Sequence, residues 1–282
     1  NLFVKVEGEI VQIANPLREE LSIMRPSIIP SVLQVIDNNL KNGNNSLRLF
    51  ELGKSFLKVD ENKRTILPSF FEFEQLVVAI TGKKNPKQWA VQSQDVDFYD
   101  IKGIIQSMFE FLKFKNYSFK NLNEKDSIFS NNSLQILVEN EPVGILGDIP
   151  KNILKKFDVD TNVFIACIDL EKIYASCKKE MKYTKVSQYP AMTRDLCFIL
   201  NDKIMSEEII EEINKINIAI LKEITIFDIY KGKNIEQGKK SIAFSLTFQS
   251  EERTLTDEEV DSIVKNIIHS IENKFNAQLR TF

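Results

Sequence analysis

A tyrosine followed by a lysine-rich turn is the part of this sequence whose residue types most directly suggest chemistry. Tyr230 ends the apolar run ITIFDIY, and Lys231, Lys233, Lys239 and Lys240 lie in the turn KGKNIEQGKK that follows. An aromatic ring can stack on an unpaired base, and an ammonium group attracts a phosphate. Tyrosines at strand ends and lysines in hairpins are also common on solvated surfaces, so the pattern alone leaves both interpretations open.

Other kinds of chemical site fit the sequence poorly. The run from Gly232 to Ser241 has the glycines and lysine of a phosphate-binding loop, but it joins two expected strands and no helix N-terminus follows it. The chain has three cysteines, none in C-x-x-C spacing, and one histidine, His269. These counts argue against a disulfide framework, a zinc site and a histidine-activated nucleophile. We therefore expect neither a catalytic residue nor a metal site in this chain.

The composition is that of an ordinary globular protein. The 282 residues are 43% hydrophobic and 27% charged, with a formal net charge of −3. This length allows two domains, and this charge excludes a uniformly basic nucleic-acid binder but not a local basic patch. No apolar run approaches the about 20 residues that span a bilayer, and the cysteine usage fits a reducing compartment. We expect a cytoplasmic protein without membrane contact and, because it begins at Asn1, a piece of a longer chain.

The first domain, residues 1–176, mixes helical and strand-like patterns. Apolar spacing predicts helices over 26–40 and 97–114, the second capped by Asp97 or Asp100. Branched and aromatic residues predict strands at 8–17, broken by Asn15-Pro16, and at 47–57, 73–82, 133–139, 142–149 and 162–170. We expect an antiparallel sheet with helices packed against it. The lysine-rich segment 177–187 has no clear period and is interpreted as a linker.

The second domain, residues 188–282, shows a sharper pattern. Strands are predicted at 194–200, 219–230 and 239–249, with a short fourth at 277–280. Ser206 is the expected N-cap of a helix over 206–216, and Thr256 with Glu259 forms an expected capping box before a helix that extends to Phe275. The order β-α-β-β-α-β predicts a ferredoxin-like sandwich in which both helices cover one face of the sheet.

Alternation along the strands predicts which side chains lie on the uncovered face of this sheet. The expected inward residues are Leu196, Phe198, Phe227, Ile229, Ile242, Phe244, Leu246 and Phe248. The expected outward residues are Asp195, Cys197, Asp228, Tyr230, Ser241, Ala243, Ser245 and Thr247. The uncovered face would then hold one aromatic ring, small neighbours and the lysine-rich turn.

These residues carry a resemblance to a known family. The stretches YPAMTRDLCFIL and FDIYKGKNIEQGKKSIAFSLTFQSEERTLTDEEV resemble the ferredoxin-fold anticodon-binding domain at the end of bacterial phenylalanyl-tRNA synthetase beta subunits, from Tyr189 to Arg280. In the first domain NPLREELSIMRPSIIPSVLQVIDNNL, RLFELGKSF and VDFYDIKG look like that subunit's class II synthetase-like core. The resemblance covers nearly the whole chain and implies an α+β protein that is the carboxy-terminal part of a longer subunit.

The resemblance also implies a function. The family's holoenzyme, two alpha and two beta subunits, uses ATP and Mg²⁺ to charge tRNA(Phe) with phenylalanine. The arginines that bind ATP in class II active sites have no counterpart in 1–175, so we expect a non-catalytic core that binds no cofactor itself and no DNA. The family's anticodon contacts fall on Tyr230, which would stack on a base, on Ser241, which would hydrogen-bond a base edge, and on Cys197, where the family often has alanine. We add the four turn lysines as phosphate contacts.

One stretch departs from the family, and two alternatives stay open. Where the family has His-Pro-Gly and Glu-x-His-Pro, this chain has IFSNNSLQ and GDIPKNI, which we interpret as a drifted surface loop. The first alternative is a single-chain catalytic synthetase, which would carry the class II arginines. The second is a docking or small-molecule-sensing ferredoxin-like module, for which a glycine-lined turn would be expected where this chain has LNDKIMSEE.

Overall fold

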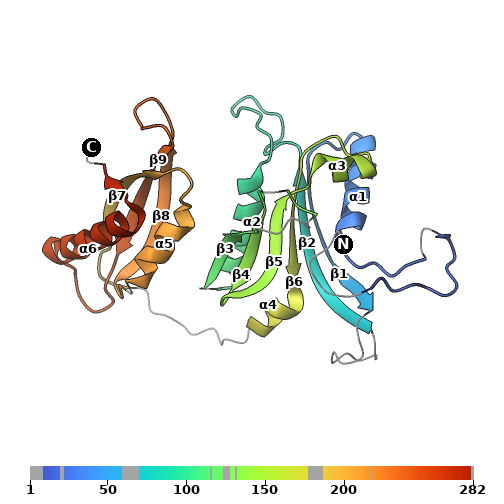
Figure 1. Cartoon of the computed structure of the whole chain (residues 1–282), viewed down its shortest axis with the longest axis horizontal. Helices are drawn as coiled ribbons and strands as arrows, with labels where there is room; N and C mark the ends of the chain where they lie inside the picture. The colour runs from blue at the N-terminus through green and yellow to red at the C-terminus, as the bar shows by residue number, and fades with distance from the viewer. Residues whose placement is uncertain are drawn as a thin grey trace. The chain divides into compact units, whose positions relative to one another are not determined.

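The computed structural model describes residues 9–19, 22–58, 70–114, 116–122, 128–130, 132–176, 187–216 and 218–280. The chain divides into two compact units, Asn1–Glu180 and Met181–Phe282, each described by itself (Figure 1). This division falls inside the predicted linker 177–187, of which 177–186, with Cys177, lie outside the described residues. Within the described ranges, none of the helices combines the length and apolar content that a membrane crossing requires.

Unit 1 is built on a six-stranded sheet in the order β1-β2-β6-β5-β4-β3, in which every neighbouring pair is antiparallel (Figure 1). The strands are β1 (Leu47–Lys58), β2 (Phe70–Thr81), β3 (Tyr117–Asn121), β4 (Leu134–Val138), β5 (Glu141–Asp148) and β6 (Val163–Asp169). The helices are α1 (Ile29–Lys41), α2 (Phe98–Phe111), α3 (Lys151–Leu154), which continues into the 3-10 turn η2 (Lys155–Phe157), and α4 (Leu170–Ser176). The antiparallel sheet, both predicted helices and five of the six predicted strands are confirmed.

A core lies on each face of this sheet, and alternate residues of β6 belong to different cores. Ile165 and Cys167 pack in a first core with side chains of α1 and α3. Ala166 and Ile168 pack in a second core with side chains of α2 and α4. Burial, and secondarily the charge of Asp169, raise the pKa of the Cys167 thiol to about 12, so this cysteine is an inert core residue.

Two predictions for unit 1 are wrong. The predicted strand at 8–17 is present only as two isolated bridges, Glu9 with Lys58 and Gln12 with Ile23, in a segment that contains Asn15 and Pro16. The stretch around 128–130 is not a drifted surface loop, because Ile128 and Phe129 are buried in the first core. There the Ser130 hydroxyl donates a hydrogen bond to the Asp148 carboxylate, which ties the stretch to β5.

Unit 2 has the predicted order β-α-β-β-α-β. Its elements are β7 (Met192–Asn201), α5 (Ser206–Lys215), β8 (Leu221–Tyr230), β9 (Lys239–Phe248), α6 (Asp257–Phe275) and β10 (Gln278–Leu279). The sheet order is β10-β7-β9-β8, again antiparallel throughout (Figure 1). One core joins the two helices to one face of the sheet, including Phe198, Phe244 and Phe248, which are fully buried.

The helix starts of unit 2 differ slightly from prediction. The N-cap of α5 is Met205 rather than Ser206, and its amide donates to the Glu208 carboxylate at 2.8 Å. Thr256 caps α6 as predicted by accepting from the Glu259 amide. The carboxylate of Glu259, however, is held by Arg253 at 2.7 Å, so the contact back to the N-cap amide that the capping box predicts is replaced by an ion pair.

Candidate nucleic-acid interface

The side of the unit 2 sheet that faces away from α5 and α6 is here called the open face. Strand register arranges it in rows: Tyr230, Ser241 and Ile199 form one row across β8, β9 and β7. Asp228, Ala243 and Cys197 form the next row. The predicted outward positions of β7 and β9, and Asp228 and Tyr230 of β8, therefore share one face.

Tyr230 is exposed at the end of β8, and its ring lies against the backbone of Gly232. Its side chain is 39% exposed. A Cβ added to Gly232 would lie 2.2 Å from the Tyr230 hydroxyl oxygen and 2.4 Å from the carbon that bears it. Glycine leaves space for the ring here, since any side chain at this position would displace the tyrosine side chain from where it lies. The Tyr-x-Gly spacing thus leaves room for the tyrosine ring to lie against the turn.

Ser241 and Cys197 lie on the open face, but they are buried rather than exposed. Their residues are 3% and 4% exposed, and the Cys197 sulfur lies 3.0 Å from the Ser241 hydroxyl oxygen. Both side chains are short, and in its row Ser241 stands between the larger Ile199 and Tyr230. Alternation correctly predicted the face of these two residues, but it predicted neither their burial nor the hydrogen bond that joins them.

The four turn lysines differ in their surroundings. Lys231 lies 3.9 Å from Asp202, Lys239 forms an ion pair with Glu236 at 2.7 Å, and Lys233 is exposed. Lys240 pairs in register with Leu200, on the helix side of the sheet, and is half-buried. Burial, and then the charge of Lys231, lower the pKa of the Lys240 ammonium, although Asp202 and Glu208 oppose the shift. Lys233 is therefore the most freely placed of the four to meet a phosphate, and Lys240 the least.

Two residues predicted to lie in the core, Phe227 and Ile229, are exposed instead. Phe227 is 53% exposed, whereas Ile224 and Ile226 of the same strand pack against the core. The cause is a β-bulge: Ile226 pairs with Phe244 and Asp228 with Ala243, so Phe227 is inserted between consecutive pairs. Ile229 has the predicted inward register but is 52% exposed. Alternation counted from Tyr230 fails at the bulge, and the residue types carry no signal of it.

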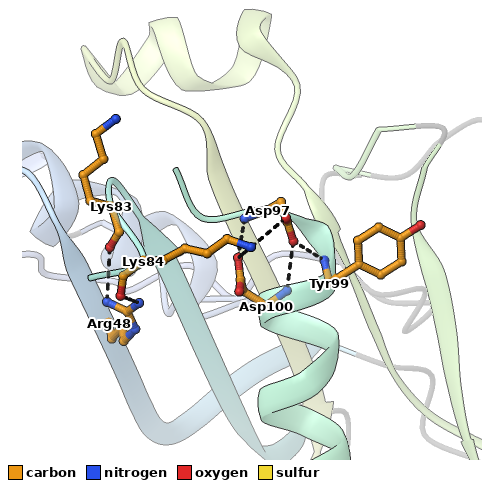
Figure 2. A network of polar contacts seen from close by, with 6 residues as sticks. All are labelled: Arg48, Lys83, Lys84, Asp97, Tyr99 and Asp100. Atoms are coloured by element: carbon orange, nitrogen blue, oxygen red, sulfur yellow. Dashed lines mark hydrogen bonds and ion pairs between the residues drawn. The ribbon is translucent and has the colours of Figure 1, made fainter. Parts of the chain in front are cut away.

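Unit 1 holds a separate cluster of charges at the start of α2 (Figure 2). Lys84 lies 2.8 Å from the Asp97 carboxylate and 3.0 Å from that of Asp100. Asp97 is the N-cap, accepting from the amides of Tyr99 and Asp100, and the Asp97 amide donates to Asp100, which completes a capping box. Arg48 fixes the backbone beside Lys84 by donating to the Lys84 carbonyl oxygen at 2.6 Å. These charges are mutually paired, so the cluster anchors the helix start.

The pKa values in this cluster follow from the pairing. Burial alone would raise the pKa of Asp97, but hydrogen bonds from Lys84 and from the Tyr99 and Asp100 amides hold it below its ordinary value. Hydrogen bonds to Asp97 and Asp100 raise the pKa of Lys84. Among the described residues, no group of three or more histidine, cysteine, aspartate or glutamate side chains is placed to hold a metal ion.

Comparison with known proteins agrees with both units. Residues 3–170 match the family described as the phenylalanyl tRNA synthetase beta chain CLM domain, and residues 187–280 match the ferredoxin-fold anticodon binding domain. The chain is 31% identical over 270 residues to the phenylalanine–tRNA ligase beta subunit of Clostridium tetani, with 96% of this chain and 32% of that protein covered. It is 32% identical over 272 residues to the same subunit of Oceanobacillus iheyensis, covering 96% and 33%. It thus spans about a third of the length of these relatives. The first family match extends over more than half of the sequence, and the chain belongs to the phenylalanyl-tRNA synthetase beta chain family.

Proposed function

We propose that this chain is the carboxy-terminal part of the beta subunit of a phenylalanine–tRNA ligase and that its open face binds the tRNA anticodon. The observation that carries the proposal is the exposed ring of Tyr230, which lies against Gly232 at the lysine-rich end of a sheet whose other face is covered by helices. An exposed aromatic ring beside cations suits an unpaired base and its phosphate. The family match of 187–280 is to a domain described as anticodon binding.

Within this proposal the open-face residues have different roles. Tyr230 stacks on an anticodon base, and Ser241 offers its hydroxyl to a base edge. Because the Cys197 sulfur lies 3.0 Å from the Ser241 hydroxyl oxygen, Cys197 acts by orienting that hydroxyl as well as by bordering the base. Lys233 meets a phosphate. The other three lysines support it more weakly, because Asp202 attracts Lys231, Glu236 pairs with Lys239, and Lys240 is partly buried.

Unit 1 serves in this proposal as a non-catalytic, class II synthetase-like core that supports an alpha subunit. The supporting observations are its antiparallel sheet with helices on both faces and the pairing of its charged cluster around Lys84. The assembled enzyme, with two alpha and two beta subunits in the cytoplasm, would take ATP and Mg²⁺ at sites outside this chain. Phenylalanyl adenylate would then form on the alpha subunit, and this chain would contribute tRNA binding.

Replacing Tyr230 by alanine tests the proposal. One base–aromatic stack is worth about 1–3 kcal/mol, so Tyr230→Ala should weaken tRNA(Phe) binding by about 5- to 150-fold. In the assembled ligase the same variant should raise KM for tRNA and leave ATP–pyrophosphate exchange unchanged, because the amino acid and ATP sites lie elsewhere. Filter binding and pyrophosphate exchange measure the two effects.

A matched control is available in unit 1. Tyr99 is an exposed tyrosine at the start of α2, 74% exposed, and its side chain points away from the Lys84 cluster (Figure 2). Tyr99→Ala should therefore leave the affinity of this chain for tRNA(Phe) unchanged. Equal affinities of wild type and Tyr230→Ala, or pyrophosphate exchange by the isolated wild-type chain, would contradict the proposal.

A further inference from the structure

The bulge in β8 gives the open face a second aromatic side chain. β8 is an edge strand, and its register with β9 shifts between Ile226 and Asp228. The extra residue at the shift is Phe227. Bulges are frequent at sheet edges and beside functional sites, where they turn a side chain toward a new direction.

Phe227 lies on the face that Tyr230 shares. Ile226 pairs with the inward Phe244 and packs with the core, and the next residue of a strand projects to the opposite side. Asp228, on the other side of the shift, pairs with the outward Ala243. Phe227 and Asp228 therefore both lie opposite Ala243 on the open face, which explains why Phe227 is 53% exposed and absent from the core.

A single exposed apolar residue is common on protein surfaces, whereas two exposed rings on one strand form a larger apolar surface. Phe227 and Tyr230 are three residues apart, about 10 Å along a strand. Other RNA-binding sheets hold two or three bases on aromatic rings exposed on one face. The exposed carboxylate of Asp228 beside Phe227 repels phosphate, whereas the lysines lie beyond Tyr230. This charge distribution favours a base at Phe227 and the backbone at the turn.

We propose that Phe227 is a second stacking platform for tRNA and takes a base of the anticodon loop other than the one on Tyr230. The inference rests on the proposed function of the open face and extends it from one base to two. Phe227 acts through its π surface, so a side chain of similar apolar area without a ring should not replace it.

The test uses this chain, tRNA(Phe) and single abasic substitutions in the anticodon loop. Phe227→Ala and Phe227→Leu should each weaken binding by about 5- to 150-fold, which corresponds to about 1–3 kcal/mol for one stack, and Phe227→Trp should retain affinity. In wild type, removal of either stacked base should reduce affinity. In Phe227→Ala, affinity should no longer depend on one of these two bases but should still depend on the other. In Tyr230→Ala, affinity should depend on the first base and no longer on the second.

Ile229→Ala is the matched control, because Ile229 is 52% exposed on the same strand but pairs with Ile242 on the helix side. It should bind tRNA as wild type does. If Tyr230→Ala weakens binding while Phe227→Ala and Phe227→Leu bind normally, the proposal that Phe227 is a second stacking platform is wrong, and the proposed function stands. If wild type does not bind tRNA(Phe), the proposed function itself fails. Urea denaturation of each variant shows whether a loss of affinity arises from unfolding.

Discussion

The two sheets of this protein differ in how many faces they bury. The sheet of unit 1 separates two cores, one with α1 and α3 and one with α2 and α4. The sheet of unit 2 has a single core, and its other face carries Tyr230 and Phe227 with much of their surface exposed. A strand buried on both faces has little surface left for a ligand, whereas a strand buried on one face can present every second side chain. The candidate interface therefore lies on the second sheet.

The largest expected effects on stability come from substitutions in the cores, which test this comparison between the two sheets. In β6, Ile165 and Ile168 are fully buried in different cores, so replacing either by alanine should reduce the free energy of unfolding by about 2–5 kcal/mol. In β9, Phe244→Ala should cost about 3–5 kcal/mol, because Phe244 fills the single core. Urea denaturation followed by circular dichroism measures these changes.

The neighbouring residue of β9 provides the contrast. Ser245 pairs with Asp195 on the open face and is partly exposed, so Ser245→Ala should change stability by no more than about 0.5 kcal/mol. A large loss of stability in Ser245→Ala, or a small one in Ile168→Ala, would remove the distinction between a sheet buried on two faces and one buried on one face.

A test of medium size concerns Asp97, the paired N-cap of α2 in unit 1. Loss of an N-cap costs about 0.5–2 kcal/mol, so Asp97→Ala should destabilise unit 1 by this amount at pH 7, and Asp97→Asn, which keeps a capping oxygen, by less. The folded-state pKa of Asp97 is lowered, so its ionic contribution is present above the unfolded value of about 3.9 and is lost as the pH falls through the lower folded value. The stability difference between wild type and Asp97→Asn should therefore narrow below about pH 4.

The smallest expected effect concerns the lysines of the unit 2 turn. For single-stranded RNA, the slope of log affinity against log salt changes by about 0.7 for each neutralised phosphate. Lys233→Ala should flatten the slope by about this amount, because the Lys233 side chain is exposed. Lys240→Ala should change it less, since Lys240 is half-buried on the helix side. Equal slopes for wild type and Lys233→Ala would make the turn an ordinary solvated hairpin.

The sequence alone was sufficient to predict the structure wherever the local residue pattern and the tertiary packing agree. Alternation in β9 correctly placed Ile242, Phe244, Leu246 and Phe248 in the core, which α6 completes with Val260, Val264, Ile267 and Ile271. The strand and helix order of unit 2 followed from two clean periods, one of two residues and one of 3.6, which residue types alone reveal. The same alternation placed Tyr230 and Ser241 on the open face, and the register confirms this placement.

The rest was decided by contacts between segments distant in sequence. Pairing with β9 inserts Phe227 as a bulge and exposes it, because register depends on the partner strand and not on local residue types. Enclosure by neighbouring strands buries Ser241 and Cys197 and brings their side chains together. The stretch at 128–130 departs from the family in sequence yet enters the core, because apolar surface is buried wherever a partner surface is available. Sequence thus determined most of the elements and, outside the β8 bulge, the faces of the unit 2 strands, and tertiary structure alone determined which residues of the open face are accessible.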